Sequence, residues 1–208
     1  MHILLIGIQG SGKGTMARKI LETHPYAFFE MGQKLRNFSQ MEEPGSREVR
    51  ELLAGGNLVS NDLVEKMLLH YRSTHDGTGV LFDGVPRSMA QKELFDRVFP
   101  EYAIVYLDLS REKAIERLSG RRIDPTTGES FPANFVGDFS PMTGVKLVHR
   151  EDDNPAAVTK RIDTYYANTL PLLALWASEG KRVYRIDASQ DVETCFRQIE
   201  VVLSAYTV

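Results

Sequence analysis

Cysteine is nearly absent from this chain, since Cys195 is the single one among 208 residues. One thiol excludes an internal disulfide framework and a zinc site built from thiolates. No apolar run approaches the roughly 20 residues that a membrane-spanning helix needs. The first residues, 1–6, lack the basic flank and the small-residue cleavage site of a signal peptide and are better interpreted as a strand. We therefore expect a cytoplasmic protein with no membrane partner.

A strong net charge is also missing. The formal charge of −3 gives the chain no general attraction to nucleic acid or to an anionic membrane, so neither is an expected partner. Any polyanion that the chain binds must be held by a local cluster of cations. With 42% hydrophobic residues, the 208-residue chain is long enough for one well-filled core carrying small insertions.

Short apolar runs alternate with helical stretches along the chain, which is typical of an α/β fold with a parallel sheet and crossover helices. The runs that fit strands buried on both faces are 3–6, 27–29, 80–82, 103–107 and 183–186. Helices are expected near 14–23, 47–54, 62–71, 89–98, 111–118, 156–178 and 192–203. Ser110 and Asn154 have the residue type and the position of helix N-caps.

Two segments interrupt this alternation. Residues 30–60 are helical and separate two strands, whereas residues 120–153 hold many prolines and glycines without a helical period. An irregular segment of that length in a compact domain is usually a functional lid or a small subdomain. We therefore expect one domain, 1–208, made of a core (1–29, 61–119 and 154–208), a helical insertion (30–60) and a lid (120–153).

A glycine-rich loop, Gly7-Ile8-Gln9-Gly10-Ser11-Gly12-Lys13-Gly14-Thr15, follows the first apolar run and opens a helix. Its glycines allow backbone N–H groups to turn toward phosphate oxygens, and the helix adds its positive end. Lys13 supplies a point charge to the phosphates. The hydroxyl that usually follows the lysine comes one residue later, at Thr15. The loop predicts a site for a nucleotide triphosphate.

A second motif, Asp83-Gly84-Val85-Pro86-Arg87, follows the apolar run 80–82. Asp83 should lie at the carboxyl end of a strand, where open α/β sheets bind their ligands. A carboxylate at this place can hold magnesium directly or through water. Gly84 and Pro86 force a turn that presents Arg87 to the same crevice.

Arginines gather around the expected lid. Arg121 and Arg122 stand at its start, Arg150 at its end and Arg161 in the following helix. Guanidinium groups grip phosphates in a bidentate way and spread the charge of a transferring phosphoryl group. The acids that follow Arg150 offer it local ion pairs as the alternative explanation.

These motifs resemble those of the nucleoside monophosphate kinase family, and in particular bacterial adenylate kinases with a long lid. The resemblance covers nearly the whole chain and rests on Gly7–Thr15, Asp83–Arg87, Gly120–Arg122 and Arg150–Asp153. The Gly14-Thr15 spacing is the form that this family uses. The resemblance implies a P-loop kinase with a five-stranded parallel sheet, acting as a monomer and moving the γ-phosphoryl group of ATP to AMP, reversibly, to give two ADP.

The resemblance also implies site residues. ATP with Mg²⁺ would contact Gly10, Ser11, Gly12, Lys13, Gly14, Thr15, Arg117, Arg121, Ser130, Phe131 and Gln190. AMP would contact Met31, Arg36, Asn57, Leu58, Val59, Gly84, Val85, Pro86, Arg87, Gln91, Arg150 and Arg161. The catalytic residues would be Lys13, Arg87, Arg121, Arg150 and Arg161, and Asp83 would hold Mg²⁺ through water. The insertion 30–60 would bind the monophosphate.

The acceptor side departs from the family pattern. Glu30-Met31-Gly32-Gln33 stands where the family has Ser-Thr-Gly-Asp, so that a hydroxyl and an acid are replaced and a new acid appears. Gln91 still suits the edge of adenine, because an amide can form two hydrogen bonds with it. Two alternatives to an AMP kinase therefore stay open, namely a kinase for UMP, CMP or GMP and a nucleotide-binding sensor with weak turnover.

The lid also lacks the four cysteines that hold zinc in some bacterial relatives, so no zinc is expected. The matching positions carry Asp124, Thr127, Ser140 and Thr143. Short polar side chains of this kind either form a hydrogen-bonded network that ties the lid together or are ordinary turn residues.

Overall fold

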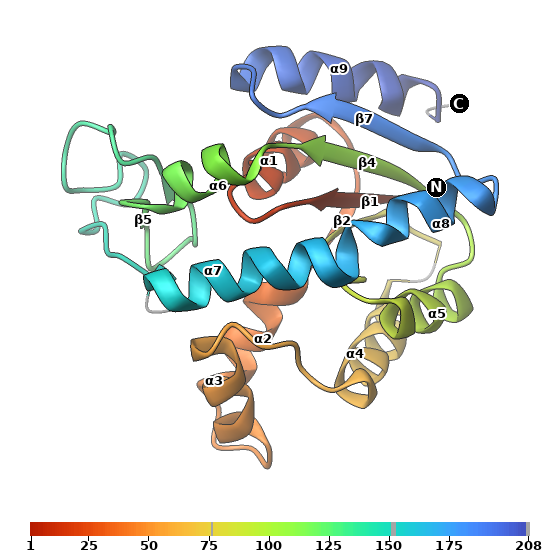
Figure 1. Ribbon diagram of the computed structural model, residues 1–208, viewed down its shortest axis with the longest axis horizontal. Coiled ribbons are helices and arrows are strands. Elements are labelled where there is room, and N and C mark those ends of the chain that lie inside the picture. The colour runs from red at the N-terminus through yellow and green to blue at the C-terminus, as the bar shows by residue number, and fades with distance from the viewer. Residues whose placement is uncertain (76, 151–152, 207–208) are drawn as a thin grey trace.

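A parallel five-stranded sheet forms the centre of the computed structural model, which describes residues 1–75, 77–150 and 153–206 (Figure 1). The strand order is β2-β3-β1-β4-β7. Their bounds are β1 (His2–Gly7), β2 (Ala27–Glu30), β3 (Val80–Asp83), β4 (Tyr102–Asp108) and β7 (Val183–Asp187). The five predicted strands are thus confirmed, each slightly longer than its apolar run.

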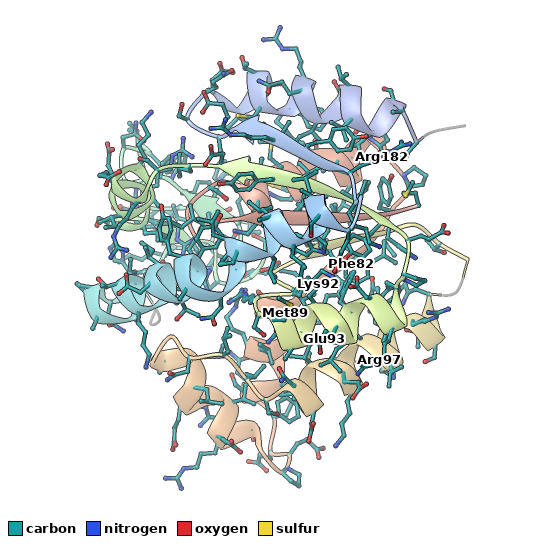
Figure 2. The ribbon with its side chains drawn as sticks, turned by 45° about the vertical axis from the view of Figure 1, so that its right-hand side comes forward. Phe82, Met89, Lys92, Glu93, Arg97 and Arg182 are labelled. Carbon is teal, nitrogen blue, oxygen red and sulfur yellow. The ribbon has the colours of Figure 1, made fainter. Side chains whose placement is uncertain are left out.

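Helices cover both faces of this sheet. The α-helices of the described residues are α1 (Lys13–Thr23), α2 (Met31–Ser39), α3 (Ser46–Ala54), α4 (Asn61–Thr74), α5 (Met89–Val98), α6 (Arg111–Leu118), α7 (Pro155–Thr164), α8 (Pro171–Ser178) and α9 (Val192–Ser204). One face packs on α1 and α9, and the other on α4, α5 and α8. On α5, Lys92 is buried whereas Glu93 and Arg97 lie on the exposed side (Figure 2).

Alternate strand residues supply the two cores. Ile3 and Leu5 of β1 belong to the α1 and α9 side, and Leu4 and Ile6 belong to the opposite side. This alternation follows from the two-residue period of a strand. Because both faces are covered, both sets are apolar, which is why these strands appear in the sequence as unbroken hydrophobic runs.

The long helix predicted at 156–178 is divided. Between α7 and α8 lies η2 (Tyr165–Thr169), one turn of π-helix in which the Leu170 N–H donates to the Tyr165 carbonyl at 2.9 Å. Pro171 follows it and has no N–H to continue the α-helical pattern. The Asn154 cap is confirmed, since its side chain accepts from the Ala157 N–H at 2.9 Å.

The two interrupting segments differ in structure. Helices α2 and α3 of the 30–60 segment extend away from the sheet on one side (Figure 1). The 120–153 segment contains a small antiparallel pair, β5 (Arg122–Ile123) and β6 (Ser130–Phe131), which is too short to be recognised as strands in the sequence. Among the described residues, no helix has the length and apolar character that crossing a bilayer requires.

Candidate active site

One large cavity of about 870 Å³ lies at the carboxyl ends of the strands. It is lined by the glycine-rich loop, by the ends of β2 and β3 and by parts of both interrupting segments. The cavity brings together nearly every residue predicted for either nucleotide: Gly10, Ser11, Gly12, Lys13, Gly14, Thr15, Met31, Arg36, Asn57, Leu58, Val59, Asp83, Gly84, Arg87, Gln91, Arg117, Arg121, Ser130, Phe131, Arg150, Arg161 and Gln190. Val85 and Pro86 line instead a neighbouring cavity of about 40 Å³, behind the turn.

The glycine-rich loop has the geometry of an anion site. Gly12 has a φ of +92°, and a Cβ on Gly7 would stand only 2.6 Å from the Ser11 hydroxyl. The space where a Gly14 side chain would stand is open. Helix α1 begins at Lys13, so its first N–H groups face the cavity. The buried Ser11 hydroxyl has no hydrogen-bond partner among the described residues, as expected of a group that awaits a ligand.

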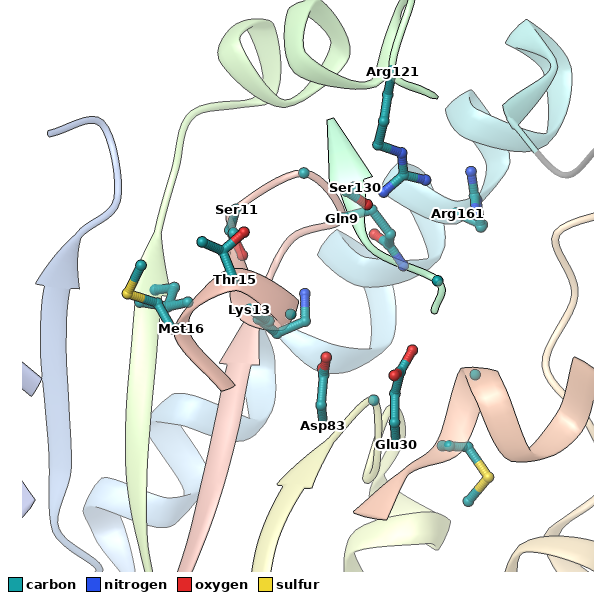
Figure 3. A pocket seen from close by; sticks show the side chains of 18 of the residues that line it. Gln9, Ser11, Lys13, Thr15, Met16, Glu30, Asp83, Arg121, Ser130 and Arg161 are labelled. Atoms are coloured by element: carbon teal, nitrogen blue, oxygen red, sulfur yellow. The ribbon is translucent and has the colours of Figure 1, made fainter. Parts of the chain in front are cut away.

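Lys13 lies at the centre of the cavity beside Asp83 (Figure 3). Its ammonium group donates to the carbonyls of Gly7 at 2.7 Å and of Ile8 at 3.0 Å. Burial lowers the pKa of Lys13 to about 8, although the nearby Asp83 carboxylate opposes this change. Burial likewise raises the pKa of Asp83, and Lys13 opposes it. Each of the two groups therefore stabilises the charge of the other.

The turn after β3 is fixed from three directions. The Arg87 guanidinium donates to the Gly84 carbonyl at 2.8 Å, and the Arg87 backbone N–H donates to the Gln91 side-chain oxygen at 2.9 Å. The Arg87 carbonyl accepts from the Thr169 hydroxyl at 2.8 Å. Since an N–H can only donate, the Gln91 oxygen faces Arg87 and its NH₂ group is not used by this bond. Thr169 belongs to the π-helical turn and was not found by sequence reasoning.

Asp153 holds two of the predicted arginines. Its carboxylate accepts from Arg121 at 2.6 Å and from Arg161 at 2.7 Å, and the Asp153 side chain is only 6% exposed. Burial lowers the pKa of Arg121, and Asp153 opposes this change. Glu151 and Asp152, which precede it in the motif, lie outside the described residues. The role of Asp153 as a common partner of both arginines was missed, because their positions lie 32 and 8 residues away.

The acceptor side contains an unpredicted ion pair. Arg36 donates to the Glu30 carboxylate at 3.1 Å and to the Gln33 side-chain oxygen at 2.9 Å. Asn37 accepts from the Gln33 amide at 2.8 Å and fixes its orientation. Met31 is buried and lines the cavity close to Gly84.

Four polar residues of the 120–153 segment, Asp124, Thr127, Ser140 and Thr143, lie in one cluster. Asp124 is fully buried and accepts from the Thr143 hydroxyl at 2.5 Å and from the Thr126 and Thr127 N–H groups at 2.7 and 3.3 Å. Hydrogen bonds from Thr143 and Ser140 hold the pKa of Asp124 well below its usual range. The cluster thus has the connections that the sequence suggested.

Magnesium fits this site in a limited way. No group of three or more His, Cys, Asp or Glu side chains that could hold a metal gathers in the described part of the chain. Mg²⁺ commonly binds through one or two carboxylates while water and substrate phosphates complete its shell. Asp83, buried in the cavity beside Lys13, suits that arrangement.

Comparison with known proteins agrees with this geometry. The family model of adenylate kinase matches residues 5–181. The adenylate kinase of Francisella tularensis subsp. novicida is 34% identical over 96% of this chain and 97% of its own length. Those of Chloroherpeton thalassium, at 31%, and Novosphingobium aromaticivorans, at 30%, align over at least 99% of both chains. The chain therefore belongs to the adenylate kinase family and is a nucleoside monophosphate phosphotransferase.

Proposed function

We propose that the large cavity binds ATP and AMP together and transfers the γ-phosphoryl group between them to give two ADP. The observation that carries this proposal is the convergence of cations on one cavity. The cations predicted to bind phosphate are Lys13, Arg36, Arg87, Arg121, Arg150 and Arg161, and all of them line the cavity. Two nucleotides bring about six negative charges, of which magnesium offsets about two. The number of cations in the cavity therefore matches the charge of two bound nucleotides better than the charge of one.

ATP takes the side of the glycine-rich loop. The N–H groups at the start of α1 and the Lys13 ammonium bind its phosphates, while Arg117 and Gln190 lie where the adenine would bind. Bound magnesium would be held through Asp83 and would neutralise phosphate charge. Arg121, Ser130 and Phe131 reach the cavity from the 120–153 segment and close over the nucleotide.

AMP takes the opposite side, under the 30–60 segment. Arg36 and Arg87 bind its phosphate, and Gln91 offers its NH₂ group to the base. An oxygen of this phosphate attacks the γ-phosphorus while the bond to the bridging oxygen breaks. No general base is needed, because the attacking oxygen is already an anion. Arg121, Arg150 and Arg161 stabilise the charge that spreads over the transferring group.

The test is an acceptor comparison. Purified protein with ATP and Mg²⁺ receives AMP, UMP, CMP or GMP in turn, and chromatography measures the nucleoside diphosphates formed. AMP is expected to be the best acceptor, and Lys13→Met is expected to lose at least about a thousandfold in rate as the control for contaminating kinases. Faster transfer to another monophosphate would contradict the proposal. Tight binding of ATP and AMP without turnover would support a sensor instead.

The proposal also covers the moving parts of the chain, its oligomeric state and its cellular compartment. The 30–60 and 120–153 segments act as two parts that close over the core and exclude water. The chain works as a monomer in the cytoplasm, where a reducing environment suits its one buried, unpaired thiol, Cys195. Light scattering after size exclusion measures the monomer mass, and cell fractionation followed by blotting checks the compartment.

A further inference from the structure

Glu30 places a negative charge in a cavity that must bind anions. It is the last residue of β2, and its register partner on the neighbouring strand is Asp83. Both carboxylates point into the cavity on the side of Lys13 (Figure 3). The two acids influence each other, because the charge of Glu30 contributes to raising the pKa of Asp83. Glu30 is therefore not a solvent-exposed surface charge without a role, because its charge acts inside the cavity.

The partner of Glu30 supplies that explanation. Its carboxylate accepts from the Arg36 guanidinium at 3.1 Å, across the junction between β2 and the first turns of α2. Gln33 adds a second oxygen at 2.9 Å, and Asn37 holds the Gln33 amide in place. Two oxygens thus meet one nitrogen of the guanidinium, where a phosphate would present its own oxygens.

We propose that Glu30 competes within the molecule for the guanidinium that binds the acceptor's phosphate. This inference rests on the proposed function. An incoming monophosphate must displace the Glu30 carboxylate from Arg36 and then lie beside it. The first step loses an ion pair of partly exposed groups, whose side chains are 29% and 35% exposed. The second adds repulsion between like charges. Glu30 thereby weakens acceptor binding and speeds release of the acceptor-side product.

The size of the effect follows from these two contributions. Partly exposed ion pairs contribute about two- to fivefold in an equilibrium. Repulsion of a phosphate by a carboxylate in a cavity of intermediate dielectric adds a further factor of similar size. Replacing Glu30 by the neutral, isosteric glutamine should therefore tighten AMP binding about tenfold. A residue that only oriented Arg36 would give the opposite sign, because its loss would weaken binding.

Calorimetry with Glu30→Gln tests this, with AMP as ligand and no ATP or Mg²⁺ present. The expected result is an AMP dissociation constant about tenfold lower and an unchanged dissociation constant for adenosine, which lacks the phosphate. Glu51→Gln is the matched control, because it breaks an exposed ion pair with Arg47 in the same segment, outside the cavity. That variant should bind AMP as the wild type does.

Three results would overturn the inference: unchanged AMP affinity in Glu30→Gln, weaker AMP affinity, or an equal gain for adenosine. Weaker binding of Mg²⁺–ATP with unchanged AMP affinity would instead assign Glu30 to the metal. ATP affinity without metal shows that the variant is folded, and Glu30→Ser repeats the comparison if it is not. Failure of the wild type itself to bind AMP would contradict the proposed function and not this inference.

Discussion

Replacing Thr143 by valine removes one hydroxyl from the cluster around Asp124 and keeps nearly the same side-chain volume. The lost hydroxyl donates to the buried Asp124 carboxylate at 2.5 Å and accepts from the Val145 N–H at 3.3 Å. If the cluster ties the 120–153 segment together, the segment should open more readily in this variant.

The magnitude follows from the bonds that are lost. A typical hydrogen bond contributes about 0.5–1.5 kcal/mol. Thr143 is exposed, so water can replace part of what the hydroxyl provides. We therefore expect a loss of about 1 kcal/mol in the local free energy of opening, which corresponds to about fivefold faster exchange. The affected amides are those of Thr126 and Thr127, which donate to Asp124.

Hydrogen exchange measured by NMR at pH 7 is the direct assay, because it reports the opening of single amides. Thr126→Val is the matched control. Thr126 contacts Asp124 through its backbone N–H, which valine retains. Exchange in the control should match the wild type. Equal exchange rates in Thr143→Val and wild type would refute the network and leave the four residues as ordinary turn residues.

The pH dependence gives a second check on the same reasoning. The folded-state pKa of Asp124 is lowered by its hydrogen bonds. Its contribution to stability is therefore fully present above the ordinary aspartate pKa of about 3.9 and is lost as the pH falls through the folded-state value. The local free energy of opening in the wild type should stay constant from about pH 7 to 5 and fall below about pH 4. A free energy of opening that stays constant down to pH 3 would show that the ionised carboxylate does not stabilise the segment.

Two further predictions concern the nucleotide side. The pKa of Lys13 without bound nucleotide is about 8, so ATP affinity measured by calorimetry should fall as the pH rises through about 8. Lys13→Arg should remove that step from the pH profile, because arginine stays charged. A flat pH profile of the wild type would contradict this prediction. Arg18 of α1 and Glu129 of the 120–153 segment form an ion pair at 2.5 Å, so Glu129→Gln should speed opening and raise kcat about twofold at low salt. The gain should vanish at about 0.5 M salt, and a ratio that does not change with salt would exclude this ion pair as its cause.

The central sheet could be predicted because its physical cause is local. A strand covered on both faces must be apolar throughout, so 3–6 and 103–107 stand out in the sequence. The break in the long helix could not be predicted in this way. Apolar residues continue at helical spacing through Pro171, and a π-helical turn differs from an α-helical one by a single residue.

The residues of the candidate site likewise fall into those that a local motif predicts and those that depend on distant contacts. The glycine-rich loop and the Asp83–Arg87 turn are continuous motifs, and they could be identified without the structure. Partners that are distant in sequence could not, as the contact between Thr169 and Arg87 spans 82 residues. Glu30 illustrates a third case. Its change of residue type was visible, but its pairing with Arg36 spans a strand end and a helix start, so no periodic pattern predicts it.

The π-helical turn also bears on how many residues the chain needs between α7 and α8. Each residue of an α-helix turns the following part by about 100° and advances it by about 1.5 Å. The π-helical turn accommodates one extra residue without this rotation, because the Leu170 N–H donates to the carbonyl five residues earlier, so deleting one residue within Tyr165–Thr169 would restore a regular helix. Thr169, whose hydroxyl donates to the Arg87 carbonyl, lies within this turn, so a deletion would put that contact at risk rather than the alignment of the two flanking helices. In this part of the molecule the number of residues matters as much as their identity.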